Sequence, residues 1–221
     1  MISWRMLGTE VSALGAAALS MPLRWLVRPE RYDPSAPHAA PVVLVHGFLG
    51  DPTNFLLLRS YLAAHGVRNF ATFSYPPRVD YPRLACRLNH VIETLCQATG
   101  ATEVDIVGHS LGGLVGRYLV ELGAGRRVRR LVTLGAPYFA SPLPSHELAI
   151  YGANDPFVPA PHPAWGPHAA ALAAGNRIVI IPECGHWGLL YHPVALREVA
   201  RFIQHPVTAV VPLPRLALEA G

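Results

Sequence analysis

The fold of this chain is decided by the stretch Val107–Gly113, which reads VGHSLGG and matches the pattern Gly-x-Ser-x-Gly. The run before it, Glu103–Val107, is typical of a buried strand, and the run after it, Leu114–Leu122, is typical of a helix. Between a strand and a helix, this pattern forms a sharp turn that leaves the serine hydroxyl exposed above the sheet. We therefore predict that Ser110 is a nucleophile, although a serine that only caps a helix is the alternative.

Short apolar runs alternate with helical patterns along most of the remaining chain. This alternation predicts an α/β fold with a mostly parallel sheet of about six strands and helices on both faces. Besides the strand before Ser110, the expected strands are Val42–Val45, Asn69–Ser74, Leu131–Leu134, Leu148–Tyr151 and Ile178–Ile181. Besides the helix after it, the expected helices are Thr53–His65, Arg83–Ala98, Ala169–Ala174 and Pro193–Ile203.

The organisation along the chain suggests three parts. Residues 1–40 form an apolar leader or surface helix followed by a proline-rich linker, residues 41–205 form the catalytic domain, and residues 206–221 form a tail. The apolar run Val11–Leu23 is too short to span a bilayer easily. Two interpretations stay open: an uncleaved helix on the domain or membrane surface, which we favour, and a secretory signal peptide. Glu10 argues for the first, because a signal peptide begins with a positive region.

The composition narrows the function classes. Hydrophobic residues make up 51% of the chain and charged residues 14%, which excludes a disordered or fibrous protein. The net charge is only +4, and part of it lies in residues 126–130, which we expect in an exposed helix–strand loop. We predict no nucleic-acid partner. The sequence carries no signal for an oligomeric state.

The cysteines and histidines show no metal-ligand spacing, so we predict neither a metal nor a cofactor. Cys86 and Cys96 fall on one expected helix about 15 Å apart, too far to form a disulfide. Cys184 is expected to be a buried thiol without a catalytic role.

A serine hydroxyl needs an adjacent base, and the base needs a group that orients it. Both should follow the carboxyl ends of strands. Asp155 is the only aspartate after Ser110, and it follows an expected strand, whereas Glu147 opens that strand at the wrong end of the sheet. His186 follows the strand Ile178–Ile181 in a glycine-flanked loop. We predict Asp155 as the acid and His186 as the base, with Glu183 as the second choice of acid.

A tetrahedral intermediate places negative charge on the former carbonyl oxygen, which backbone amides can stabilise. We expect the amide of Leu111, at the start of the helix, and the amide of Phe48, in the loop after the first strand, to form this oxyanion hole. His46 is expected to hold the shape of that loop by hydrogen bonding.

Four segments together resemble α/β-hydrolase lipases over about residues 41–204, most closely the compact, lid-less bacterial lipases. They are His46–Phe48, Gly108–Val115, Gly152–Asp155 and Gly185–Tyr191. The resemblance implies carboxylic ester hydrolysis through an acyl-enzyme, with Ser110, Asp155 and His186 as the catalytic triad and the amides of Phe48 and Leu111 as the oxyanion hole. The leader before residue 41 and the proline-rich loop Pro156–Pro167 depart from the family pattern.

The segment Tyr138–His146 is too short for the helical lid that larger relatives insert between these strands. We therefore expect an open site with an apolar wall suited to an acyl chain of a small-molecule or lipid ester. The expected substrate-binding residues are Phe48, Leu49, Tyr138, Phe157, Trp165, Trp187 and Leu189, with Leu111 and Phe139 nearby; several of these are expected to belong to the core instead.

Several alternatives remain open at this stage. The same machinery serves thioesterases, lactonases and amidases, and a non-catalytic binding module is a further alternative. A cell-associated protein whose residues 1–31 touch the membrane surface is favoured over a secreted one.

Overall fold

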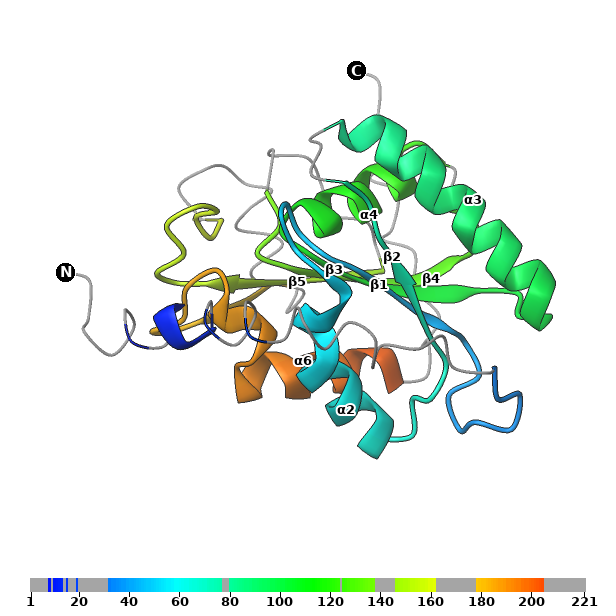
Figure 1. Cartoon of the computed structure of the whole chain (residues 1–221), viewed down its shortest axis with the longest axis horizontal. Coiled ribbons are helices and arrows are strands. Elements are labelled where there is room, and N and C mark those ends of the chain that lie inside the picture. Colours follow the sequence, from blue (N-terminus) through cyan, green and yellow to red (C-terminus); the bar gives the residue numbers. More distant parts are fainter. Residues whose placement is uncertain are drawn as a thin grey trace, which may run out of the picture.

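The computed structural model describes residues 8, 10–13, 15, 19, 32–76, 80–123, 125–137, 146–161 and 178–204. Its centre is a six-stranded sheet in the order β2-β1-β3-β4-β5-β6, and every neighbouring pair is parallel (Figure 1). The predicted parallel sheet is confirmed. The strands are β1 (Val42–Val45), β2 (Phe70–Phe73), β3 (Val104–His109), β4 (Val128–Leu134), β5 (Glu147–Gly152) and β6 (Ile178–Ile181).

Helices cover both faces of the sheet, as predicted. Figure 1 shows α3 (Tyr81–Thr99) and α4 (Leu111–Glu121) on one face, and α2 (Leu56–Ala64) and α6 (Pro193–Gln204) on the other. Two short 3-10 helices, η2 (Pro52–Phe55) and η4 (Gly188–Leu190), complete the described elements. The expected helix at 169–174 lies outside the described residues.

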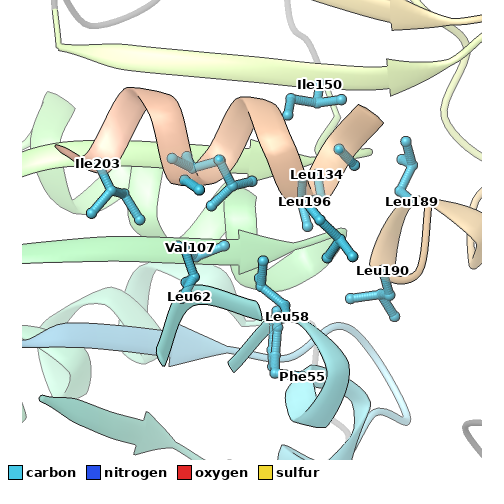
Figure 2. Packing of buried hydrophobic residues seen from close by; sticks show 14 of the residues in the cluster. Phe55, Leu58, Leu62, Val107, Leu134, Ile150, Leu189, Leu190, Leu196 and Ile203 are labelled. Atoms are coloured by element: carbon cyan, nitrogen blue, oxygen red, sulfur yellow. The ribbon is translucent and has the colours of Figure 1, made fainter. Parts of the chain in front are cut away.

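Each face of the sheet is sealed by an apolar cluster. On the side of α2 and α6, Leu58, Leu134 and Leu196 interdigitate between helices and strands (Figure 2). Leu58 is 1% exposed, so its burial contributes roughly 1.5–3 kcal/mol to folding. A second cluster fills the side of α3 and α4. The two layers fix the strands, and with them the loops at the carboxyl ends of the strands.

The basic run at 126–130 corrects one prediction, because β4 already begins at Val128 and takes up two of its arginines. Arg130 is buried at 5% exposure, and the Arg129 guanidinium lies 2.6 Å from the Asp105 carboxylate. His38 lies 2.8 Å from the same carboxylate. Asp105 is fully buried in the neighbouring strand, and a buried carboxylate requires such partners. The expected exposed loop is therefore wrong for residues 128–130.

The connection between β4 and β5 consists of residues 135–146, of which the structure describes 135–137 and 146. The tail at 206–221 lies outside the described residues. Within the described ranges, no helix is both long and apolar enough to cross a bilayer.

Candidate active site

Ser110 occupies the turn between β3 and α4. Its backbone adopts φ 52° and ψ −120°, a conformation that a residue with a side chain adopts only when its surroundings impose it. The Ser110 amide donates to the Leu134 carbonyl at 2.8 Å, and the Ser110 carbonyl accepts from the Gly113 amide at 3.0 Å. The serine is thus tied on one side to the end of β4 and on the other to the first turn of α4.

The glycines around Ser110 are required by close backbone contacts. A Cβ atom at Gly112 would lie 2.1 Å from the Val45 carbonyl oxygen, and one at Gly108 would lie 2.5 Å from the Gly113 nitrogen. Backbone atoms of paired strands and helices cannot move aside to relieve such contacts. The spacing of the motif therefore reflects the packing of α4 against β1 and β3.

Asp155 and His186 meet in the loops that follow β5 and β6. The Nδ1 atom of His186 lies 2.6 Å from Oδ2 of Asp155. The other carboxylate oxygen, Oδ1, accepts from the amides of Phe157 and Val158, each at 2.8 Å. A carboxylate only accepts, so Nδ1 of His186 carries the proton and Nε2 keeps its lone pair. This is the tautomer that a general base requires.

The two competing carboxylates lie elsewhere. Glu147 begins β5 at the opposite end of the sheet, where it is fully buried and pairs with Arg117 at 2.6 Å. It also accepts a hydrogen bond from Thr133 at 2.7 Å. Glu183 is exposed to solvent. Of the three carboxylates considered from sequence, Asp155 is the one hydrogen-bonded to His186.

The end of β4 brings the serine and the acid–base pair together. The carbonyl of Leu134 holds the Ser110 amide, and the next residue, Gly135, lies directly against the pair. A Cβ atom at Gly135 would lie 3.1 Å from Nδ1 of His186 and 3.2 Å from Oδ2 of Asp155. Gly135 has φ 57°, which glycine adopts freely. The three predicted catalytic residues therefore converge at one edge of the sheet.

His109 is a residue of the site that the sequence argument missed. Its ring lies 4.7 Å from the His186 ring, and its Nε2 donates to the His186 backbone carbonyl at 3.1 Å. Burial, with a smaller effect from His186, lowers the pKa of His109 to about 3. His109 is therefore neutral at physiological pH. It links the turn around Ser110 (residues 108–112, the serine turn) to the loop after β6 that carries His186 (residues 182–188, the histidine loop). Its position directly before Ser110, the predicted nucleophile, was the available signal.

The two expected oxyanion donors are the amides of Phe48 and Leu111. Among the residues that the structure describes, neither amide has a hydrogen-bond acceptor. Leu111 begins α4, where the helix dipole adds positive potential. In the Phe48 loop, Nδ1 of His46 lies 2.9 Å from the Gly47 carbonyl oxygen, a contact that fits the role expected for His46.

The loops that carry the site also carry exposed apolar side chains. Phe48 is 43% exposed, Leu49 66% and Phe157 69%, and the Phe157 ring meets His186 edge-on at 5.4 Å. Trp187 is half-buried next to His186.

Leu189 corrects the predicted wall. It is fully buried in the cluster beneath the sheet (Figure 2), because η4 turns it toward α6 and β5, so it belongs to the core. Tyr138 and Trp165, also predicted to bind substrate, lie outside the described residues.

Comparison with known proteins agrees with this architecture. The family model of the alpha/beta hydrolase fold matches residues 40–149, which include the strand–serine–helix turn. The chain has the α/β-hydrolase fold. Among solved structures, Aspergillus fumigatus lipase B matches with a TM-score of 0.60 and 15% identity, covering 80% of this chain and 55% of that one. A Listeria innocua protein matches with a TM-score of 0.57 and 18% identity, covering 77% and 96%.

Two curated relatives carry the name triacylglycerol lipase. The proteins from Pseudarthrobacter phenanthrenivorans and Burkholderia plantarii are each 33% identical to this α/β-hydrolase over 109 residues, or 46% of its length. The matched stretch spans 34% of the first relative and 30% of the second. The similarity thus covers about a third of each relative.

Proposed function

We propose that this α/β-hydrolase is a serine hydrolase of carboxylic esters, an esterase or lipase that works through an acyl-enzyme intermediate. Ser110 is the nucleophile, His186 the general base and Asp155 the residue that orients it. The observation that carries the proposal is the 2.6 Å hydrogen bond between His186 and Asp155, next to a serine held on a strained turn.

The geometry supports the following sequence of steps. His186 Nε2 takes the hydroxyl proton of Ser110 as the serine oxygen attacks the ester carbonyl. Asp155 stabilises the imidazolium, and the amides of Phe48 and Leu111 donate to the oxyanion. His186 then returns the proton to the departing alcohol, which leaves an acyl group on Ser110. Water, deprotonated by His186, attacks this acyl-enzyme. The bond between the acyl carbon and the serine oxygen then breaks, and His186 returns the proton to the serine oxygen as the acid leaves.

Two observations favour an ester with an apolar acyl chain. The side chains of Phe48 and Leu49, on the loop after β1, and of Phe157, against His186, are apolar and exposed, and apolar walls favour acyl chains over charged substrates. The curated relatives that share residues with this chain are named triacylglycerol lipases.

The test combines active-site labelling with a substrate panel. A fluorophosphonate probe should label the protein and fail to label Ser110→Ala. Turnover should then be measured on p-nitrophenyl esters of two to eighteen acyl carbons and on matched thioesters, lactones and amides. We expect the highest kcat/KM on esters. A higher value on another acyl class would identify that class as the substrate, whereas no labelling and no turnover by folded protein would indicate a binding module.

A further inference from the structure

The histidine loop is held by a carboxylate from the far end of the chain. Glu10 lies in a helical N-terminal segment that sits beside the loop after β6, seen in Figure 1 as blue against orange. Its Oε1 accepts from the Gly188 amide at 2.8 Å, and its Oε2 accepts from the Trp187 amide at 3.0 Å. These two amides directly follow His186, so Glu10 binds the backbone that carries the predicted base.

The loop is shaped around this carboxylate. At Gly185, the three atoms nearest to a Cβ atom would all belong to Glu10, and the closest, Cδ, would lie at 2.4 Å. A Cβ atom at Gly188 would lie 2.7 Å from Oε1 of Glu10. Neither glycine has a positive φ, so close approach of the Glu10 side chain, rather than backbone conformation, favours glycine at these two positions.

Burial makes the contact energetically specific. Glu10 is only 8% exposed, and a carboxylate withdrawn from water is strongly destabilising unless it accepts hydrogen bonds. Two amides aimed at the two carboxylate oxygens supply charge-assisted bonds of the stronger kind. Burial, together with the negative charge of Glu10, raises the pKa of the adjacent Cys184 thiol to about 12. Cys184 thus stays protonated beside the carboxylate.

We propose that Glu10 is a positioning residue for His186, a role that rests on the function proposed above. His186 has three anchors: Asp155 holds its ring, His109 holds its carbonyl and Glu10 holds the two following amides. Without Glu10, the amides of Trp187 and Gly188 lose their acceptor, and His186 keeps only two of its three anchors, so its ring is held less precisely between Asp155 and Ser110. The proposal also assigns residues 8–13 to the working enzyme, since cleavage of the segment as a leader would remove Glu10.

The first experiment measures kcat and KM separately for Glu10→Ala and Glu10→Gln. A misplaced catalytic group slows the chemical step but leaves substrate binding largely unchanged. We therefore expect kcat to fall about 10- to 100-fold for Glu10→Ala. KM should stay within about twofold. Glu10→Gln retains one acceptor oxygen but turns an NH2 group toward an amide donor. Its kcat should therefore lie between that of the parent protein and that of Glu10→Ala.

Two control variants separate this role from general damage. Val11→Ala changes an exposed neighbour in the same segment, and Glu183→Gln removes an exposed carboxylate from the histidine loop itself. Both should retain the kcat of the parent protein. Equal losses in Glu10→Ala and a control would overturn the proposal, as would a rise in KM at unchanged kcat, which would make the segment a wall of the substrate pocket.

A double-mutant cycle tests the contact itself. Gly185→Ala should lower kcat when Glu10 is present, because the new methyl group collides with the carboxylate. In the Glu10→Ala background the collision partner is gone, so the same substitution should cost much less. Additive effects in the two backgrounds would contradict the contact.

A spectroscopic measurement keeps the test independent of turnover. The Nδ1 proton shared by His186 and Asp155 should give a downfield NMR resonance that broadens or shifts in Glu10→Ala and stays in place in Val11→Ala. An unchanged resonance with unchanged kcat would overturn the positioning role even if the variant unfolds at a lower temperature. If the parent protein hydrolyses no ester, the proposed function fails, and this resonance still decides whether Glu10 positions His186.

Discussion

The serine turn and the histidine loop are held in place by different kinds of contact. Ser110 is held by the backbone of its own β3–α4 unit and of the adjoining strands, and its neighbour Gly112 packs against the backbone of β1. His186 is held by side chains, and one of them, Glu10, is 177 residues away from its partner Trp187 in the sequence. Backbone contacts tolerate almost no displacement, whereas a side-chain anchor can be removed by one substitution without disturbing a strand. Rigidity at the proposed nucleophile thus has a local origin, and rigidity at the proposed base has a long-range origin.

The largest effect is expected from Ser110→Ala. Since this hydroxyl is the proposed nucleophile, its loss should lower kcat by roughly 10⁴–10⁶-fold while the thermal unfolding temperature changes little. Ester hydrolysis measured alongside circular dichroism tests both expectations. Retention of a tenth of the parent activity would remove Ser110 from the mechanism and, with it, the functional meaning of the strained turn.

Asp155→Asn should follow, with a fall in kcat of about 10⁴-fold and little change in KM. The amide side chain can present an NH2 group to Nδ1 of His186, which would favour the wrong tautomer of the ring. The matched control is Glu183→Gln. Glu183 is a solvent-exposed carboxylate at the same end of the sheet as Asp155. A silent Asp155→Asn together with a damaging Glu183→Gln would show that the acid is misassigned.

Contacts between residues near one another in the sequence explain why much of the fold and of the candidate site was predictable. β1 and β6 have the expected bounds because short runs of β-branched and other apolar residues are distinctive, and the motif around Ser110 is contiguous. Asp155 could be selected because it was the only aspartate after the serine. Leu189 was misplaced because apolar residues in a loop near a site have the same pattern whether they face the core or the substrate.

Contacts between residues far apart in the sequence explain what sequence reasoning missed. Glu10 was used only as an argument against a signal peptide, since nothing near it in the chain indicates the loop that it binds 177 residues later. Arg129 was expected in solvent because its partner, the buried Asp105, belongs to another strand. In both cases a charge is buried because its partner comes from a distant segment, and spacing along a sequence does not encode such pairs.

Gly112→Ala and Gly185→Ala compare the backbone contacts of the serine turn directly with the side-chain contacts of the histidine loop. The first places a methyl group 2.1 Å from the backbone oxygen of Val45 and should lower the free energy of unfolding by about 3 kcal/mol or more. The second collides with the Glu10 side chain, which has rotatable bonds, so its cost should be smaller. Urea denaturation of both variants provides the measurement. Equal destabilisation would contradict the distinction between a backbone-held turn and a side-chain-held loop.

The smallest effect concerns His109, which joins the two regions. Its pKa is about 3 in the folded protein, because burial disfavours the imidazolium, and near 6.5 when unfolded. Below pH 6.5 the unfolded chain therefore binds a proton that the folded chain does not, and stability falls as the pH falls. This residue should contribute about 1.4 kcal/mol per pH unit, which applies from about pH 6 down to about pH 4.

His109→Gln isolates that contribution, since a glutamine NH2 group can still donate to the His186 carbonyl but does not titrate. The free energy of unfolding should be measured by urea denaturation at intervals between pH 4 and pH 8. We expect the stability of the variant to depend less steeply on pH below 6.5, while His46, whose pKa burial also lowers, contributes equally to both proteins. Identical slopes would mean that His109 takes up its proton at the same pH in the folded and unfolded chains. Burial would then not be what keeps this ring neutral where it donates the one hydrogen bond between the described residues of the serine turn and the histidine loop.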